Sequence, residues 1–187
     1  MSDNHETPSS LLTQCKKNLP EGWERMKVLY GRLILYWCKN AGLQENDRYD
    51  VYQDVMLTLV KNIHQFRKER PGDKFRKWLK TITHSRISDF FRKQQQQPIL
   101  KDMAEFSERE AIRNTREAEE VEILFQQLFQ LLKSHFDAKT LEAFRLMNRP
   151  GSTSEEVGKE LGMTAVAVRA AKKRVMDRIR KDYGDLL

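Results

Sequence analysis

The sequence has little cysteine, little glycine and proline, and no long apolar run. Its 187 residues include two cysteines, Cys15 and Cys38, and no Cys-x-x-Cys pair, which excludes a secreted disulfide framework and a cysteine zinc or redox motif. Eight glycines and five prolines exclude collagen-like and proline-rich classes. No apolar run approaches the roughly 18–20 residues of a membrane span. Residues 1–8 are polar and lack the apolar stretch of a signal peptide. We therefore expect a cytoplasmic protein without membrane insertion.

Enzyme signatures are also missing from the sequence. The four histidines are scattered, and the chain contains no His-Glu-x-x-His motif, no glycine-rich phosphate loop and no nucleophile elbow. We therefore expect a protein that is not an enzyme, with no catalytic residue, no metal site and no cofactor. Both cysteines are expected to be plain thiols.

Charge is abundant and unevenly distributed. The chain has 34 Lys and Arg against 27 Asp and Glu, which gives a net charge of +7. Residues 67–93 carry ten basic and three acidic side chains, and residues 164–183 carry seven basic and two acidic ones. Residues 101–122 between them carry eight acidic and four basic side chains. This alternation favours two polyanion-binding units on an acidic tether over a uniformly solvated surface.

Apolar residues recur at three-to-four spacing through most of the chain, which predicts an all-α fold. No segment shows the sustained alternation of a β-strand. Helices are expected over residues 21–40, 47–64, 74–93, 119–135, 138–147 and 165–181. We predict two small helical domains, with an N-terminal tail at 1–20, a first domain at 21–95, an acidic linker at 96–118 and a second domain at 119–187.

The second domain carries the most specific local pattern. Thr153 and Glu156 form the capping box of a short helix, and Gly162 suits the positive φ that ends it. Thr164 can cap the helix expected over 165–181. This pattern predicts a helix-turn-helix, whose second helix enters the DNA major groove. A helical hairpin that binds protein is the alternative, and the basic residues of the second helix favour DNA.

The helix expected over 165–181 has one apolar face and one basic face. Val168, Val175 and Ile179 are expected to be buried, which leaves the opposite face for DNA. Base readout falls mainly on Arg169 and Lys173, because the neighbouring alanines offer only apolar contact to thymine methyl groups. The candidate DNA residues of this helix are Thr164, Arg169, Ala170, Lys173, Arg174 and Arg178.

The first domain has its own basic helix, over residues 74–93, in which aromatic residues are interleaved with cations. This combination suits single-stranded nucleic acid. Phe75 and Trp78 lie at helical spacing with Leu79 and Ile82, so we expect them in the core. The basic residues on the opposite face are then the candidate contacts.

Three blocks of this sequence together resemble one family. Residues 50–59 (DVYQDVMLTL) resemble an acidic helix of region two of bacterial sigma factors. Residues 75–92 resemble the adjoining promoter-melting helix, and residues 156–174 resemble region four. The order and spacing of the blocks are similar to those of two-domain, extracytoplasmic-function (ECF) sigma factors of RNA polymerase. The resemblance covers about 23–95 and 119–182.

The resemblance implies partners for each block. It implies binding to the clamp coiled coil of core RNA polymerase through Asp50, Gln53, Asp54 and Leu57, and a further contact with the polymerase flap. It implies recognition of the promoter minus-ten element, as duplex and as melted non-template strand, through Arg76, Lys77, Lys80, His84, Arg86 and Arg92. The residues of the helix at 165–181 would read the minus-thirty-five element. An anti-sigma factor is a further candidate partner of the family.

The sequence departs from the family pattern at Thr83, His84 and Ser85, which leaves the promoter preference open. We predict a sigma factor that binds core RNA polymerase, recognises promoter DNA through two elements and initiates strand opening. The alternative is a stand-alone helix-turn-helix regulator with a helical partner- or ligand-binding N-terminal domain.

Overall fold

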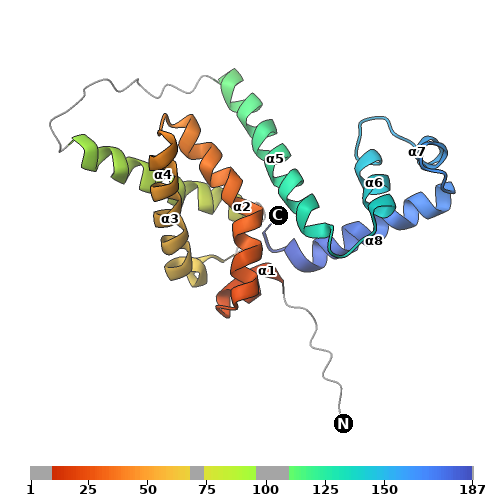
Figure 1. The fold of residues 1–187 in the computed structure, drawn as a ribbon, viewed down its shortest axis with the longest axis horizontal. Helices are drawn as coiled ribbons and strands as arrows, with labels where there is room; N and C mark the ends of the chain where they lie inside the picture. The colour runs from red at the N-terminus through yellow and green to blue at the C-terminus, as the bar shows by residue number, and fades with distance from the viewer. Residues whose placement is uncertain (1–9, 68–73, 96–109, 187) are drawn as a thin grey trace, which may run out of the picture.

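The computed structural model describes residues 10–67, 74–95 and 110–186, and in these residues the chain forms α-helices and one 3₁₀ turn, without a strand. The predicted all-α fold is confirmed. The N-terminal elements are α1 (Leu11–Lys16), α2 (Pro20–Asn40), α3 (Glu45–Asn62), η1 (Ile63–Gln65) and α4 (Phe75–Gln95). The C-terminal elements are α5 (Glu110–Leu132), α6 (Ala138–Leu146), α7 (Ser154–Leu161) and α8 (Ala165–Tyr183). Figure 1 shows α2 at the centre of the N-terminal group, with α5 running beside it.

α1 lies inside the segment that the sequence analysis treats as an N-terminal tail. The side chain of Ser10 accepts a hydrogen bond from the backbone N–H of Thr13 and caps the helix. Leu11, Leu12 and Cys15 of α1 are buried against the core. A helix of six residues is too short to show a periodic apolar pattern, which is why the sequence did not reveal it.

α2 has the apolar spacing expected over residues 21–40, and it packs against α1, α3, α4 and α5. Leu29, Leu33 and Ile34 are buried in the core, with Tyr30 and Trp37 on the same side of the helix. A helix that buries residues toward four neighbours is the scaffold on which the other elements are placed.

α3 and α4 also follow their predicted ranges to within two residues. In α3 the buried residues are Val51, Val55 and Leu59, and Tyr52 and Met56 are partly buried beside them.

The start of α4 is anchored by an aromatic cluster. The Phe75 ring lies 5.1 Å from Tyr30 and 5.2 Å from Phe66, measured between ring centroids. Leu79 and Ile87 continue its buried face.

α5 begins at Glu110, earlier than the helix start expected at residue 119. It packs along α2, and its last turns bury Leu128 and Leu132. The expected linker at 96–118 therefore becomes helical from residue 110 onward. The division into two domains remains a prediction.

α7 and α8 form the predicted helix-turn-helix. The Thr153 side chain accepts from the Glu156 backbone N–H at 3.3 Å, and the Glu156 carboxylate accepts from the Thr153 N–H at 3.1 Å. Gly162 ends α7 with φ of 60°, in the left-handed region. A Cβ on Gly158 would lie 2.7 Å from the Met163 carbonyl oxygen, so the tight turn requires glycine there.

Two apolar clusters hold the fold together. The larger one, which we call the shared core, runs from α1 through α2, α3 and α4 and includes Leu128, Leu132, Val175, Ile179 and Tyr183 of the C-terminal elements. The smaller one, the helix-turn-helix core, consists of Ala143, Leu146, Val157, Val168 and Ala171. The end of α8 therefore belongs to the core of the N-terminal elements, while its start stands on a separate core.

No helix in the described part of the chain combines the length and apolar character that crossing a bilayer requires.

Candidate polymerase and nucleic-acid surfaces

The outer face of α3 carries the residues expected to bind polymerase. Asp50, Gln53, Asp54 and Leu57 are all exposed, because the inner face of the same helix is buried against α2 and α4. The side of α3 that faces solvent is therefore both acidic and partly apolar. Leu57 is 59% exposed, which is unusual for a large apolar residue. Acidic side chains around an exposed leucine make a surface suited to a basic partner helix.

The cations expected to contact the minus-ten element lie on α4 and have different environments. Lys77 and His84 are exposed. Arg86 Nη1 and Arg92 Nη2 both pair with Asp89, at 3.1 and 2.7 Å. These two ion pairs are local to the helix, so they fix side-chain positions without covering the surface.

Arg76 and Lys80 are paired with carboxylates of α5. Arg76 Nη2 lies 3.2 Å from Glu117 Oε1, and Lys80 Nζ lies 2.9 Å from Glu120 Oε1. Arg76 Nη1 is 3.9 Å from Glu120 Oε2. The resemblance implies that these two cations face DNA, whereas in the structure acidic side chains of α5 lie against them.

Glu120 is the central acid of this group. It is 4% exposed and accepts a hydrogen bond from the indole Nε1 of Trp37 at 2.8 Å, in addition to its contacts with Arg76 and Lys80. The ammonium of Lys80 lies 6.0 Å from the centre of the Trp37 ring. A buried carboxylate needs such partners, because burial without them is costly.

Trp37, Glu117 and Glu120 were not among the candidate site residues of the sequence analysis. The sequence shows that residues 101–122 are acidic, but nothing in it indicates that Glu117 and Glu120 pair with cations of α4. Only the packing of α5 on α2 brings them together.

The candidate DNA residues at the start of α8 form an exposed face. Arg169, Ala170, Lys173 and Arg174 are exposed, and Thr164 caps the helix by accepting from the Ala167 N–H at 3.1 Å. The face opposite them is buried, as expected.

Arg169 is oriented by α7. Its Nη1 donates to Ser154 Oγ at 2.8 Å and lies 3.4 Å from Glu155 Oε1. These contacts hold its guanidinium near the junction of the two helices, where the recognition helix of this motif meets DNA.

Arg178 lies at the other end of α8, in a polar cluster with the N-terminal elements. Its Nε donates to Asp182 Oδ2 at 2.6 Å, and its Nη2 is 3.1 Å from His135 Nε2. Arg25 of α2 reaches the same Asp182 oxygen at 3.3 Å and donates to the Tyr183 hydroxyl at 2.9 Å. The structure therefore separates Arg178 from the exposed face formed by Arg169, Lys173 and Arg174.

The cysteine thiols and the possible metal ligands are two further features of the described residues. Cys15 and Cys38 are buried free thiols. Burial raises the pKa of Cys15 to about 12 and that of Cys38 to about 11, so both are protonated and unreactive at neutral pH. The described residues contain no group of three or more His, Cys, Asp or Glu placed to hold a metal ion.

Comparison with known proteins finds a similarity to one family over part of the chain. Residues 28–97 match the family model described as sigma-70 region 2. No curated protein matches the chain. Among solved structures, the structure of CnrH in complex with the cytosolic domain of CnrY matches with 19% identity, 90% of this chain and 92% of that chain covered, and a TM-score of 0.39. That score is too low to carry function across. The family match contains the outer face of α3 and the cations of α4.

Proposed function

We propose that the protein is a sigma factor of the extracytoplasmic-function type, because residues 28–97 match the sigma-70 region 2 family model. It binds core RNA polymerase, directs the enzyme to promoters through two DNA elements and starts strand opening. The family match is the observation that carries this proposal, since it spans the helices whose surfaces the function uses.

The outer face of α3 is the proposed polymerase contact. Its residues Asp50, Gln53, Asp54 and Leu57 are all exposed, and the acidic groups complement a basic coiled coil. The exposed Leu57 supplies an apolar contact one turn after Asp54 on this face. A surface of this kind has a higher cost in water than an all-polar one, which supports its role in docking.

Promoter recognition is assigned to two helices. α4 is proposed to act at the minus-ten element through Arg76, Lys77, Lys80, His84, Arg86 and Arg92. α8 is proposed to act at the minus-thirty-five element through Thr164, Arg169, Ala170, Lys173, Arg174 and Arg178. The helix-turn-helix geometry of α7 and α8 supports the second assignment. Arg178 is the weakest member, because Asp182 already binds it.

A binding and transcription experiment tests the proposal. The double charge reversal Asp50→Lys/Asp54→Lys should weaken binding to core RNA polymerase at least tenfold, as loss of charge complementarity at an interface predicts. Run-off transcription from a promoter should fall in parallel, while binding of the isolated protein to duplex DNA is unchanged. Glu45→Lys is the matched control, since Glu45 is an exposed acid at the start of the same helix.

The outcomes separate the proposal from its alternative. Wild-type protein that fails to bind core polymerase, yet binds a specific duplex alone, is a stand-alone helix-turn-helix regulator. Equal binding by the double variant and by Glu45→Lys would remove the polymerase contact from α3.

A further inference from the structure

Two pairs of side chains face each other between α4 and α5. Arg76 and Lys80 lie four residues apart on α4, and Glu117 and Glu120 lie three residues apart on α5. Residues at these spacings share one face of a helix. The three ion pairs between them, at 3.2, 2.9 and 3.9 Å, therefore join one basic face to one acidic face.

The acidic face of α5 offers the same chemistry as a nucleic-acid backbone. Carboxylate and phosphate oxygens both accept charge-assisted hydrogen bonds from guanidinium and ammonium groups. Arg76 has only 18% of its side chain exposed, and Lys80 has 38%. A phosphate cannot take both cations while Glu117 and Glu120 hold them.

Not every acidic residue in this turn of α5 pairs with α4, and Glu119 is the exception. Glu119 lies between the two, and its carboxylate accepts from the hydroxyl of Tyr36 on α2. It makes no ion pair with α4 in the described part of the chain. The contact with α4 therefore depends on particular positions of α5 and not on its total charge.

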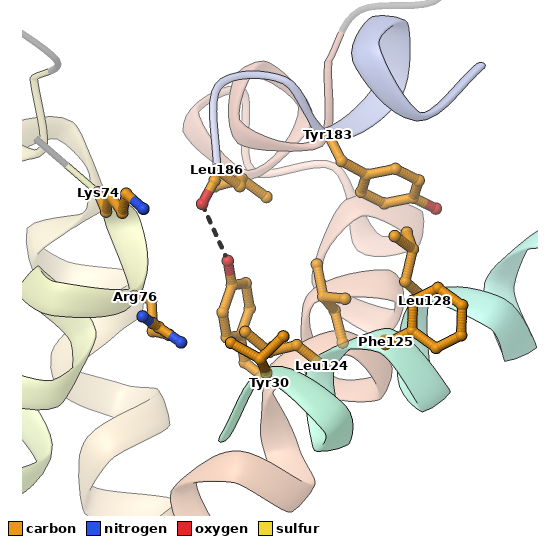
Figure 2. Close-up of a pocket in the computed structure, with 10 residues that line it drawn as sticks. Tyr30, Lys74, Arg76, Leu124, Phe125, Leu128, Tyr183 and Leu186 are labelled. Atoms are coloured by element: carbon orange, nitrogen blue, oxygen red, sulfur yellow. Dashed lines mark hydrogen bonds between the residues drawn. The ribbon is translucent and has the colours of Figure 1, made fainter. Parts of the chain in front are cut away.

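The packing around this contact is incomplete. A cavity of about 300 Å³ lies between α2, the start of α4, α5 and the C-terminal residues, lined by residues that include Leu29, Tyr30, Arg76, Leu124 and Leu186. Figure 2 shows Lys74 and Arg76 on one side of it, Leu124, Phe125 and Leu128 on the other, and the Tyr30–Leu186 hydrogen bond across it.

The pocket is partly open to solvent and lies where α5 and the end of α8 meet the N-terminal helices, so the ion pairs between α4 and α5 are not backed by close packing on this side. Across the pocket, the Tyr30 hydroxyl donates to the Leu186 carbonyl at 3.3 Å, and apolar residues of α5 and α8 pack into the shared core beside it.

We propose that the acidic face of α5 is an internal competitor of nucleic acid for the cations of α4. In the closed arrangement seen here, Glu117 and Glu120 occupy Arg76 and Lys80, and α4 is withheld from DNA. Release of α5 exposes both cations to the phosphates of the opened promoter strand. The inference rests on the proposed function, since it takes α4 as a DNA-binding helix.

The test neutralises the competitor without changing its shape. The full-length variant Glu117→Gln/Glu120→Gln keeps an amide oxygen for the Trp37 indole and removes both charges from α4. We expect it to bind a fluorescent single-stranded oligothymidine about tenfold more tightly than wild type, because each lost ion pair contributes a factor of roughly two to five. The salt dependence of binding should steepen by about 1.4 in log–log slope, as two further contacts to a single strand require.

Two further variants control for net charge and for folding. Glu119→Gln removes one charge from the same turn of α5 without touching α4, and its affinity should stay within about twofold of wild type. Glu117→Gln alone affects a carboxylate that is 64% exposed, so it cannot disturb the core. It should strengthen binding in the same direction by a smaller factor. Thermal unfolding checks that all variants are folded.

A second measurement tests whether Glu117 and Glu120 shield Lys80. Lys80 should be acylated faster in the double variant than in wild type, relative to the exposed Lys77, as measured by mass spectrometry of labelled peptides. The proposal is overturned if the double variant binds the oligonucleotide no better than Glu119→Gln, or if Lys80 labelling does not rise. Core polymerase binding is measured on the same samples. Its absence in wild type would refute the proposed function, whereas its presence with unchanged DNA affinity refutes only the competitor.

Discussion

The two basic helices of this protein differ in how their charge is held. On α4, Arg76 and Lys80 are bound by carboxylates of another element, forty residues away in sequence. On α8, Lys173 and Arg174 are exposed, and Arg169 contacts only the adjacent α7. Figure 1 shows that α4 lies within the N-terminal group beside α2, whereas the start of α8 projects away with α7.

This difference shows that a basic segment in a sequence does not define a free basic surface. The residue types on α4 and α8 are similar, and the tertiary neighbours decide which cations are open to a polyanion. Under the proposed function, α8 is open to a duplex as the chain stands, whereas the competitor proposal requires α5 to move before α4 can bind nucleic acid. The order fits a process in which duplex recognition precedes contact with an opened strand.

The largest expected effect comes from the core under α4. Phe75→Ala removes a fully buried ring that packs on Tyr30 and Phe66, and should reduce the free energy of unfolding by about 3–5 kcal/mol. Urea unfolding measures the loss. Hydrogen exchange should show faster opening of α2 and α4, while α7 keeps its protection because it stands on the helix-turn-helix core.

Phe91→Ala is the control for this change, since Phe91 is an aromatic residue of the same helix that is only partly buried. Its cost should be clearly smaller. Equal loss of protection in α4 and α7 would show that the two cores unfold as one unit, and the comparison between the helices would then lose its structural basis.

The next effect concerns DNA binding by the isolated protein. Lys173→Ala removes an exposed cation of α8 and should weaken duplex binding by about 1–3 kcal/mol if it contacts a base, or lower the salt slope by about one if it contacts phosphate. Lys80→Ala should change neither quantity, because Glu120 holds Lys80 in the closed chain. Fluorescence anisotropy over a salt series measures both. A larger effect at Lys80 than at Lys173 would reverse the comparison.

Much of the fold could be predicted because its signals are local. Thr153, Glu156 and Gly162 determine the ends of α7 by contacts within a few residues, and all three behave as expected. The ranges of α2, α3 and α4 follow from apolar periodicity. α1 was missed because it is short, and the start of α5 was missed because residues 110–118 have no clean apolar period.

The candidate site could be predicted only as far as residue type and helix face allow. Asp50 and Asp54 were named through the resemblance of residues 50–59 to an acidic sigma-factor helix, and both are exposed. The pairing of Glu120 with Trp37 and Lys80 could not be predicted, because a charged residue at a buried position looks like a surface residue in the sequence. The same holds for Asp182, which is 2% exposed and bound by Arg25 and Arg178.

A smaller effect is expected at the cap of α7. Thr153→Ala removes the hydroxyl that accepts from the Glu156 N–H and should lower stability by about 1 kcal/mol. The exchange protection of α7 should fall while that of α4 is unchanged, which is the reverse of the Phe75 result. Ser152→Ala, one residue earlier, is the control and should have little effect. If the exchange protection of α4 also fell, the helix-turn-helix core would be coupled to the shared core.

The smallest effect is expected at Asp137, whose carboxylate has its hydrogen-bond donors within one helical turn, in contrast to Glu120. Asp137 caps α6, and its carboxylate accepts from the Thr140 backbone N–H at 2.8 Å and from the Thr140 hydroxyl at 2.7 Å. Both hydrogen bonds lower the pKa of Asp137, and the bond from the Thr140 backbone N–H has the larger effect. A carboxyl with a lowered pKa in the folded state stabilises the fold above its unfolded pKa of about 3.9.

That contribution is lost as the pH falls through the lower, folded-state pKa. Asp137→Asn keeps an oxygen acceptor and removes the charge, so wild type should unfold at a slightly higher temperature than the variant at neutral pH, and the two should converge in acid. A difference that persists below the folded-state pKa would assign the cap to geometry alone. Because the donors of Asp137 lie within one turn, loss of its charge should leave oligonucleotide binding by α4 unchanged. Loss of the Glu120 charge should strengthen that binding.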